Sequence, residues 1–439
     1  MSQGVIRFIT AGSVDDGKST LIGRLLYDTK AVLADQLLAL SKTKHARVTA
    51  SDAAVDLALL TDGLEAEREQ GITIDVAYRY FATAKRKFIV ADAPGHEQYT
   101  RNLVTGASQA DVAVLLVDAT RVDLSTKPAG LLAQTKRHSA IVRLLGLRHV
   151  VVAVNKMDLL GFDENVFNAI KESVEGLATT LGLPTPHLIP VSALQGDNVV
   201  DKSDKTAWYQ GPSLLQWLEG LDTSVVHKVQ GLRFPVQYVA RQDGSAADDF
   251  RGYLGRIESG SIKKGQKVTV LPSGLEATVS EIHVSNDHQA IGDAAGVDVA
   301  KAGQVIALRL AEDVDISRGD LIVAALDSDV PTLSKQVSAD ICWLDSEPLS
   351  LARKYVLRHT TNTVFAKVKG IQQVLDVQTL SHGTDIHALN MNEIGRVDLV
   401  LQKPIVTDLF DDSPSTGAFV LIDEATNHTV AAGMVRATV

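Results

Sequence analysis

Eight residues near the start of the chain have the types and the order that hold the phosphate groups of a nucleotide. They fit the pattern G-x-x-x-x-G-K-[ST] and read Gly12-Ser13-Val14-Asp15-Asp16-Gly17-Lys18-Ser19. An apolar run at 5–9 precedes them and a helical pattern at 20–26 follows, which is the strand–loop–helix context that the pattern requires. The glycines let successive N–H groups point at phosphate oxygens, and the helix adds its positive dipole end. The stretch therefore predicts a nucleoside triphosphate site rather than an incidental turn.

Two side chains of this loop have distinct expected roles. Lys18 can reach the β- and γ-phosphates, and the hydroxyl of Ser19 can ligate Mg²⁺. The remaining loop residues and the first residue of the following helical pattern are expected to surround the phosphates, and they are Gly12, Ser13, Val14, Asp15, Asp16, Gly17 and Thr20.

A second motif, Asp92-Ala93-Pro94-Gly95-His96, follows a short apolar run at 88–91. An aspartate at the end of such a strand can hold Mg²⁺ through water, across from the phosphate loop. Gly95 lets its N–H approach the γ-phosphate, so the turn can register hydrolysis. A histidine beside a glycine is more often structural when it stands alone. Behind a phosphate loop and an Asp-x-x-Gly turn, His96 is interpreted as the residue that orients the attacking water.

A long segment separates these two motifs. Between Lys18 and Thr73 lie many residues with helical periodicity, and they end in a charged run at 65–70 and in Gly71-Ile72-Thr73-Ile74. A solvated helical insert is one interpretation, and a nucleotide-sensing switch is the other. The position before Asp-x-x-Gly favours the switch, in which Thr73 offers its hydroxyl to Mg²⁺ while the γ-phosphate is present.

The base of the nucleotide is indicated by Asn155-Lys156-Met157-Asp158, which ends an apolar run at 150–154. The carboxylate of Asp158 can accept hydrogen bonds from the ring N–H and the exocyclic amine of guanine, a pair that adenine does not present. Asn155 and the stem of Lys156 would fix the base and the loop. Backbone N–H groups of Ser192, Ala193 and Leu194 complete the expected pocket. These motifs in one order predict a GTPase that binds GTP and GDP with Mg²⁺.

The pattern of apolar runs predicts one α/β domain at 1–224, a P-loop domain built on a mostly parallel, doubly wound sheet. Its short runs are apolar on both faces, as in buried parallel strands, and they are Val5–Thr10, Lys87–Asp92, Val112–Asp118, Val150–Asn155 and His187–Val191. A helical pattern covers Glu164–Leu181. Ligand sites are expected at the carboxyl ends of these strands.

The pattern of apolar and polar residues changes from Gly231 onward. Short alternating runs separated by glycine turns predict two all-β barrel domains, at 225–330 and 331–439. The first of them contains the expected strands Phe234–Val239, Arg251–Glu258, Lys267–Leu271 and Glu276–Val284.

Composition narrows the possible partners and the compartment. The 439 residues have a net charge of −10, which gives no overall electrostatic reason to bind nucleic acid or an anionic membrane. Cys342 is the one cysteine, so a disulfide within the chain is excluded. No signal peptide or membrane span is visible, and we expect a cytoplasmic protein.

With its motifs in this order, the chain resembles the translation-factor class of GTPases, which place β-barrels after the GTPase domain as elongation factor Tu does. Within that class it is most similar to the GTPase (large) subunits of bacterial sulfate adenylyltransferase, or ATP sulfurylase. The likeness rests on residues 12–28, 75–81, 92–102, 389–395 and 416–423, so it covers nearly the whole chain. Elongation factors usually carry a histidine where Asp16 stands.

The resemblance implies that this chain hydrolyses GTP while a separate small catalytic subunit joins sulfate to ATP, giving adenosine 5′-phosphosulfate and pyrophosphate for sulfate assimilation and cysteine biosynthesis. It implies a heterodimer or a higher oligomer, with no nucleic acid or membrane as partner. Val14 and Ile72 match the apolar pair that brackets the catalytic histidine in translation factors. The segment 121–130 is longer than the family's loop, and no second P-loop of a fused kinase is present in this sequence.

Two other functions fit the GTPase motifs. A translation factor would deliver an RNA or a release factor to the ribosome, and its basic candidates here are the short clusters 353–355 and 358–359. A structural partner would bind GTP without turning it over, and His96 and Thr73 argue against that function.

Overall fold

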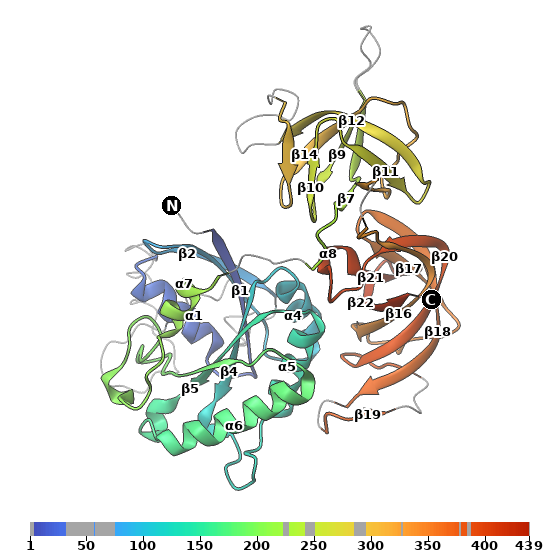
Figure 1. The fold of residues 1–439 in the computed structure, drawn as a ribbon. Coiled ribbons are helices and arrows are strands. Elements are labelled where there is room, and N and C mark those ends of the chain that lie inside the picture. The colour runs from blue at the N-terminus through green and yellow to red at the C-terminus, as the bar shows by residue number, and fades with distance from the viewer. Residues whose placement is uncertain are drawn as a thin grey trace. The chain divides into compact units, whose positions relative to one another are not determined.

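The structure is a computed structural model that describes residues 4–31, 57, 75–222, 228–241, 251–284, 296–325, 328–376, 379–383 and 388–438. The chain divides into two compact units, Met1–Ser224 with Asp376–Ser381, and Val225–Leu375 with His382–Val439. Figure 1 shows the mixed helix–strand unit and the all-β unit. Each unit is described by itself below.

The first unit is built on a sheet whose described strands follow the order β2-β3-β1-β4-β5-β6. All neighbours in this sheet are parallel except β2 and β3. The strands are β1 (Val5–Ala11), β2 (Ala77–Ala82), β3 (Lys87–Asp92), β4 (Val112–Asp118), β5 (His149–Asn155) and β6 (His187–Pro190). Because the parallel strands all end at the same edge, Thr10, Asp92, Asp118 and Asn155 lie in adjacent strand ends, with the pairs Thr10–Asp92 and Asp118–Asn155 in register.

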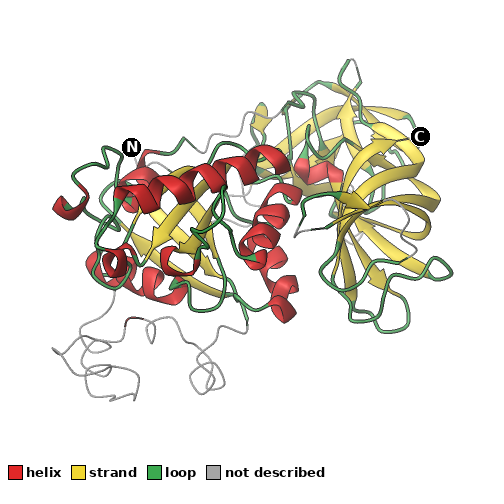
Figure 2. Ribbon diagram, turned by 90° about the horizontal axis from the view of Figure 1, so that it is seen from below, coloured by secondary structure: helices red, strands yellow, loops and turns green. Residues whose placement is uncertain are grey.

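Helices lie against both faces of this sheet (Figure 2). The helices of the described part are α1 (Lys18–Asp28), α4 (Thr100–Ala107), α5 (Ala133–Leu144), α6 (Glu164–Leu181) and α7 (Leu214–Gly220). Leucines of α1 and α7 pack with Phe8, Phe88 and Val90 in one buried core. The long helix α6 is capped by Asp163, whose side chain accepts from the Asn165 N–H, and it ends at Gly182 in the left-handed conformation. Among the described residues, none of the helices contains an apolar stretch that could span a bilayer.

The second unit begins with a sheet of the described strands in the order β7-β15-β11-β12-β14-β9-β8. The end strands β7 and β8 are separated in sequence only by residues 236–237, so the sheet curls until its two edges meet. Its strands are β7 (Phe234–Pro235), β8 (Tyr238–Arg241), β9 (Arg251–Arg256), β11 (Lys267–Leu271), β12 (Leu275–Val284), β14 (Val305–Leu310) and β15 (Leu321–Ala324), with the separate pair β10 (Ser261–Lys263) and β13 (Val299–Lys301).

The remaining strands form a second barrel, closed by the pairing of β17 with β18. They are β16 (Thr332–Trp343), β17 (Lys354–His359), β18 (Asn362–Leu375), β19 (His382–Gly383), β20 (Ile394–Thr407), β21 (Ala418–Asp423) and β22 (Thr429–Thr438), with the short helix α8 (Pro414–Gly417). Cys342 is buried in β16.

The predicted fold class is confirmed, since an α/β domain is followed by two β-barrels. Several strand bounds differ from the expected ones by one or two residues, and two larger details also differ. The run Phe234–Val239 is not one strand, because β7 ends at Pro235, which has no N–H to donate to a ladder. The edge strand β2 was not predicted as a strand, because it is only half-buried and lacks the continuous apolar run of its neighbours.

Candidate nucleotide-binding site

The predicted phosphate loop connects β1 to α1. Gly17 caps the helix with φ 92°, a left-handed conformation that favours glycine, and Asp15 also has a positive φ of 66°. A Cβ atom built on Gly17 would lie 2.4 Å from Nδ2 of Asn155. The loop therefore needs glycine at this position for two reasons, the backbone conformation and the close approach of Asn155.

Lys18 is buried and its ammonium group lies over its own loop. Its Nζ donates to the carbonyl oxygens of Gly12 at 3.0 Å and Ser13 at 2.7 Å. Burial lowers the pKa of Lys18, and the carboxylates of Asp92 and Asp16 oppose that shift. These two carbonyls hold the Lys18 ammonium group, the only positively charged side chain of residues 12–19, at the place where phosphate oxygens are expected to bind.

Ser19 and Asp92 meet at the end of β3. The hydroxyl of Ser19 donates to Oδ2 of Asp92 at 3.2 Å, and Thr10 donates to Oδ1 at 3.1 Å. Asp92 is buried, and these two hydroxyl groups hold its two carboxylate oxygens. A hydroxyl and a carboxylate in contact are oxygen donors of the kind that Mg²⁺ prefers, with phosphate and water filling its other positions.

The turn after β3 lies directly beside the phosphate loop. A Cβ atom on Gly95 would be 2.4 Å from Nζ of Lys18 and 2.8 Å from the backbone nitrogen of Val14. Glycine is thus required at position 95 for the two segments to approach this closely. Any group bound on the phosphate loop at Lys18 is therefore also next to this turn.

His96 follows Gly95 with an exposed side chain. Its Nδ1 accepts from the N–H of Gln98 at 3.3 Å, and its ring lies 6.1 Å from that of Tyr99. In the neutral imidazole this hydrogen bond places the proton on Nε2.

Helix α5 supports the turn from behind. Nε2 of Gln134 donates to the Gly95 carbonyl at 3.3 Å and lies 2.8 Å from Nε2 of His138. Since one amide group has two N–H donors, it can satisfy both partners. Burial, with the nearby charges of Lys18 and Arg137, lowers the pKa of His138 to about 3, so its imidazole is neutral.

Asn155 joins the phosphate loop to the loop after β6. Its Nδ2 donates to the Asp16 carbonyl at 2.8 Å, and its Oδ1 accepts from the N–H of Ala193 at 2.9 Å. Arg24 of α1 also holds that second loop, since its guanidinium donates to the carbonyls of Ala193 and Leu194. Asn155 therefore acts on the loops of the site, a role that the sequence pattern described only loosely.

Asp118, at the end of β4, is a site residue that the sequence analysis missed. Its Oδ2 lies 2.7 Å from Nζ of Lys156, and its Oδ1 accepts from the backbone and hydroxyl of Thr120. Burial raises the pKa of Asp118, but hydrogen bonds from Lys156 and Thr120 outweigh it, so the pKa lies below its usual range. Asp118 thereby anchors Lys156, which has a left-handed φ of 62°.

The predicted base-reading residue, Asp158, lies on the turn after Lys156 and is half-buried. Gln195 donates to its Oδ2 at 3.5 Å. Ser192 is buried with its hydroxyl accepting from the N–H of Gln195, and the side chain of Leu194 is exposed. The carboxylate of Asp158 is thus held beside the loop 192–195.

Asp16 is a buried carboxylate inside the phosphate loop. Its Oδ2 accepts from the N–H of Ser13 at 2.6 Å, while Oδ1 has no hydrogen bond among the described residues and lies 3.7 Å from Nη1 of Arg121. Burial raises the pKa of Asp16 to about 6 against the opposing charge of Lys18. Arg121 also donates to the Val14 carbonyl at 2.8 Å, so the segment 121–130 contacts this loop.

The structure brings residues 12–20, 92–96, 155–158 and 192–194 to one edge of the sheet. Thr73 and Ile72 lie outside the described residues.

Comparison with known proteins agrees with this geometry. The elongation factor Tu GTP binding domain family matches residues 3–232, and the GTP-eEF1A C-terminal domain-like family matches residues 336–436. The Bifunctional enzyme CysN/CysC of Mycobacterium tuberculosis is 49% identical over 432 residues, 98% of this chain and 67% of that protein. Sulfate adenylyltransferase subunit 1 of Shewanella oneidensis is 49% identical over 437 residues, 99% of this chain and 85% of that protein. This chain belongs to the sulfate adenylyltransferase subunit 1 family.

The resemblance expected from the sequence is thereby confirmed. The chain carries a GTP-binding domain, and the words "subunit 1" in the relatives' names indicate that such subunits work with a partner. A crystal structure of sup35 complexed with GDP also matches the whole chain, with 24% identity and a TM-score of 0.43.

Several residues of this GTPase became visible only in the fold. Asp118 belongs to no motif that we recognised in the sequence. What could have indicated it is its position at the end of β4, where it is in register with Asn155 at the end of β5. Gln134 and His138 are spaced for one face of a helix, but nothing in the sequence says that this face meets Gly95. Arg24 lies on α1 far from Leu194 in the sequence.

Proposed function

We propose that this chain is the GTPase subunit of a sulfate adenylyltransferase, which hydrolyses GTP to drive sulfate activation on a separate catalytic subunit. The observation that carries the proposal is the contact of Ser19 with Asp92 beside Lys18, in a chain 49% identical to known members over nearly its full length. GTP and water give GDP and phosphate on this chain. ATP and sulfate give adenosine 5′-phosphosulfate and pyrophosphate on the partner.

In this proposal the phosphates lie along residues 12–20. Lys18 leaves its two carbonyl partners and binds the β- and γ-phosphate oxygens, and Ser19, Asp92 and Thr73 would hold Mg²⁺. When bound, Mg²⁺ neutralises charge on the phosphates. The Gly95 N–H can approach the γ-phosphate because only glycine fits so close to Lys18. The turn can therefore respond when hydrolysis removes the γ-phosphate.

His96 orients the attacking water through its exposed imidazole. Its Nδ1 is engaged by the Gln98 N–H, so Nε2 is the atom available to the water. Gln134 holds the carbonyl of Gly95 in place, which limits the movement of the turn. In this arrangement a hydrogen bond holds the Gly95 carbonyl, while the neighbouring His96 keeps Nε2 available to the water.

Guanine is read by Asp158, with Asn155 and Lys156 fixing the loops around the base. The backbone of 192–194 closes the pocket from the other side. The support for this assignment is the pair of hydrogen bonds through which Asn155 joins Asp16 to Ala193. Specificity for GTP over ATP then depends on one carboxylate.

Forming the phosphoric–sulfuric anhydride is steeply uphill, so a second exergonic reaction is needed to move the equilibrium toward product. GTP hydrolysis supplies it when the switches of this chain contact the catalytic subunit. We propose that the partner is the small catalytic sulfate adenylyltransferase subunit, in a heterodimer or a higher oligomer, and that ATP and sulfate bind on that subunit.

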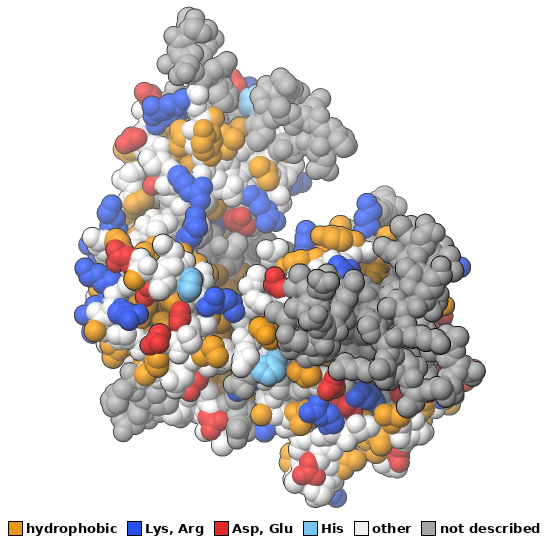
Figure 3. Space-filling model, turned by 180° about the vertical axis from the view of Figure 1, so that it is seen from behind, with side chains coloured by type: hydrophobic (Ala, Val, Ile, Leu, Met, Phe, Trp, Pro, Cys, Tyr) orange, Lys and Arg blue, Asp and Glu red, His pale blue; other side chains and the backbone are white. Residues whose placement is uncertain are grey.

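The delivery of RNA finds less support. In the clusters considered for it, Arg353 forms an ion pair with Asp423 at 3.4 Å, and Tyr355 and His359 are buried. Figure 3 shows Lys and Arg side chains interspersed with acidic ones on the face that it displays. Aromatic side chains that are buried in a barrel core are not available to stack on bases.

The test is pyrophosphate release from ATP and sulfate by the two subunits together, with and without GTP. Coupling predicts that GTP raises the yield and is hydrolysed in the same reaction. The non-hydrolysable analogue GMPPNP is the matched control and should not raise it. Hydrolysis of GTP that requires ribosomes, with no effect on pyrophosphate release, would contradict the proposal in favour of translation.

A further inference from the structure

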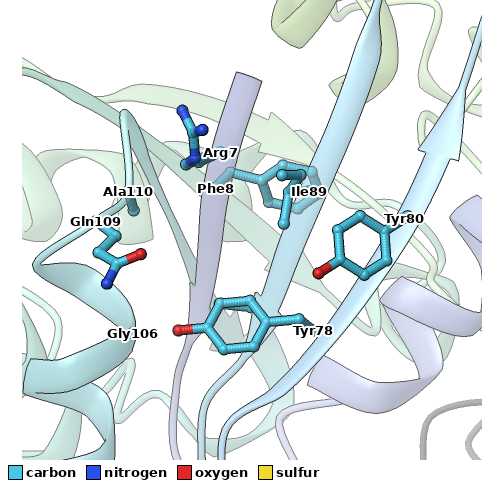
Figure 4. A pocket seen from close by; sticks show the side chains of 9 residues that line it. Arg7, Phe8, Tyr78, Tyr80, Ile89, Gly106, Gln109 and Ala110 are labelled. Carbon is cyan, nitrogen blue, oxygen red and sulfur yellow. The ribbon is translucent and has the colours of Figure 1, made fainter. Parts of the chain in front are cut away.

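A pocket with a cavity volume of about 300 Å³ opens on the first unit away from the predicted nucleotide residues (Figure 4). It lies between the strands β1, β3 and β2 and the end of helix α4. Its lining shares no residue with the phosphate loop, the turn 92–96 or the base-reading segments, and consists of Arg7, Phe8, Tyr78, Tyr80, Ile89, Ala91, Gly106, Gln109 and Ala110.

The strand register explains why this part of the sheet is open. Arg7, Ile89 and Tyr80 form one row across β1, β3 and β2, and their side chains share a face of the sheet. Ala91 and Tyr78 belong to the next row on the same face. Helix α4 covers that face only as far as Ala107, where the helix ends. The row that contains Arg7 therefore has no helix over it in the described part of the chain.

The side chains around the pocket are of the types that anchor protein contacts. Tyr80 is 68% exposed and Tyr78 is 37% exposed, although both belong to a strand of the central sheet. Figure 4 shows their rings on the β2 side of the pocket, with Gln109 on the α4 side. Tyrosine and arginine are enriched among the residues that dominate binding energy at interfaces, because they supply a large apolar surface together with polar groups.

Charge selects the kind of group that can bind here. The guanidinium of Arg7 is exposed, and no carboxylate of the described residues lies within ion-pair distance of it. Arg7 contacts Asp111 through its backbone: its N–H donates to the Asp111 carboxylate at 2.8 Å, and its carbonyl accepts from the Asp111 N–H at 2.7 Å. A partner that places a carboxylate beside this rim would complement Arg7, while an apolar side chain would fill the space between the tyrosines.

The pocket also touches the elements that carry the switch turn. Ala91 lines it, and the next residue is Asp92 of the Ser19 contact. Gly106 lies near the end of α4, the helix that begins just after the turn at 92–96. A Cβ on Gly106 would be 2.9 Å from Cδ1 of Ile9, so the helix packs tightly on β1. A group inserted here therefore contacts the strand that leads into the turn and the far end of the helix that follows it.

We infer that this pocket is an anchor site for the catalytic subunit, which inserts one apolar side chain between Tyr78 and Tyr80 and places a carboxylate on Arg7. The inference rests on the proposed function and adds to it the face through which GTP hydrolysis is coupled. An opening lined on one side by exposed tyrosines suits a side chain of a protein partner.

Binding of the catalytic subunit to the full chain tests the inference. The variants Tyr80→Ala and Arg7→Gln should each weaken the complex at least tenfold, and salt should weaken the wild-type complex more than the Arg7→Gln complex. Tyr238→Ala is the matched control, since Tyr238 is 63% exposed on β8 of the other unit and should leave binding unchanged. The affinity of each isolated variant for a fluorescent GDP should stay within twofold of wild type, which shows that the first unit is folded.

A photo-crosslinker in place of Tyr80 gives a second measurement. Replacing Tyr80 with p-benzoylphenylalanine should crosslink the catalytic subunit, and the same replacement at Tyr238 should not. Wild-type affinity in both pocket variants, or crosslinking of the chain to a second copy of itself, would overturn the anchor site and leave the proposed function standing. If the wild-type chain does not bind the catalytic subunit at all, both fail.

Discussion

Asn155 bonds to the Asp16 carbonyl through Nδ2 at 2.8 Å and to the Ala193 N–H through Oδ1 at 2.9 Å. One buried amide thus connects the loop expected to hold phosphate with the loop expected to hold guanine. The N–H and the oxygen lone pair that form these two bonds are not available to bind the base. Asn155 therefore links the two halves of the site, and its replacement should disturb both the phosphate loop and the loop expected to hold guanine.

Asn155→Ala should lower the affinity for GTP and for GDP by a similar factor of about tenfold or more. The substitution leaves the Asp16 carbonyl and the Ala193 N–H without their partner, and such losses cost about 1–3 kcal/mol each when the groups stay buried. Titration with fluorescent GDP and GTP analogues measures the effect. Preference for guanine over adenine nucleotides should persist, because Asp158 is unchanged. A loss confined to that preference would show that Asn155 reads the base directly.

Asp158→Asn should weaken the preference for guanine. The carboxylate can accept from both the ring N–H and the amine, and the amide retains one acceptor without the charge that strengthens these bonds. We expect GTP affinity to fall at least tenfold while the affinity for inorganic triphosphate is unchanged. Gln195→Ala, which removes the neighbour that donates to Asp158, is the matched control and should change GTP affinity much less. Equal GTP affinity in Asp158→Asn would remove Asp158 from its assigned role.

His96→Ala should keep GTP binding and lose most of the GTP hydrolysis that the catalytic subunit stimulates. A positioned group that orients or activates water contributes typically about 10²-fold or more. Because the side chain is exposed, its removal should leave the stability of the first unit unchanged. Single-turnover hydrolysis of bound GTP measures the chemical step apart from product release. Tyr99→Phe, on the neighbouring ring, serves as the control, and unchanged turnover in His96→Ala would exclude the catalytic role.

The parallel strands of the first unit could be predicted because each is a short run that is apolar on both faces. Val112–Asp118 and Lys87–Asp92 have the predicted bounds. The edge strand β2 could not be recognised in the same way, since Tyr78 and Tyr80 are exposed on one face and only Phe81 enters the core. Its pairing with β3 is antiparallel and depends on contacts between strands that no local pattern records. In the barrels, Pro235 divides a run that looked like a single strand.

The site could be predicted as far as local motifs reach. Loop residues such as Gly17 and Lys18 carry their chemistry within a few positions, whereas the anchor of Lys156 is Asp118, on a different strand of the sheet. That pairing follows from the parallel register of β4 and β5, which no local pattern contains. The same holds for Gln134, which meets Gly95 only because α5 packs behind the turn.

Asp408→Asn should destabilise the second unit through Arg233. The guanidinium of Arg233 is fully buried and bonds Asp408 at 2.9 Å through both Nε and Nη2. Removing one partner of a buried ion pair typically costs about 3–5 kcal/mol, and the carboxylate of Asp329, which lies 3.3 Å from Nη2 of Arg233, should offset part of that loss. Hydrogen exchange of barrel peptides should become faster, with GDP affinity unchanged. The double variant Arg233→Met with Asp408→Leu should recover most of the protection, and no recovery would mean that packing rather than charge is decisive.

Asp16 should make the stability of the first unit fall as pH rises between about 4 and 6. Burial raises its pKa to about 6, from 3.8 in a solvated carboxyl. The folded state therefore binds the proton more tightly, and this contribution is fully present below pH 3.8 and lost as pH rises through 6. A folded-state pKa that lies about two above the unfolded one corresponds to roughly 3 kcal/mol of stability.

The variant Asp16→Asn isolates this effect, because it keeps an acceptor for the Ser13 N–H but does not titrate. The difference in unfolding free energy between wild type and variant should change across the window from pH 4 to pH 6 and level off above it. His138, whose pKa is lowered to about 3, has the opposite pH dependence, but it is present in both proteins and cancels in the difference. A difference that stays constant across the window would mean that Asp16 is charged throughout and is balanced by Arg121 and Lys18.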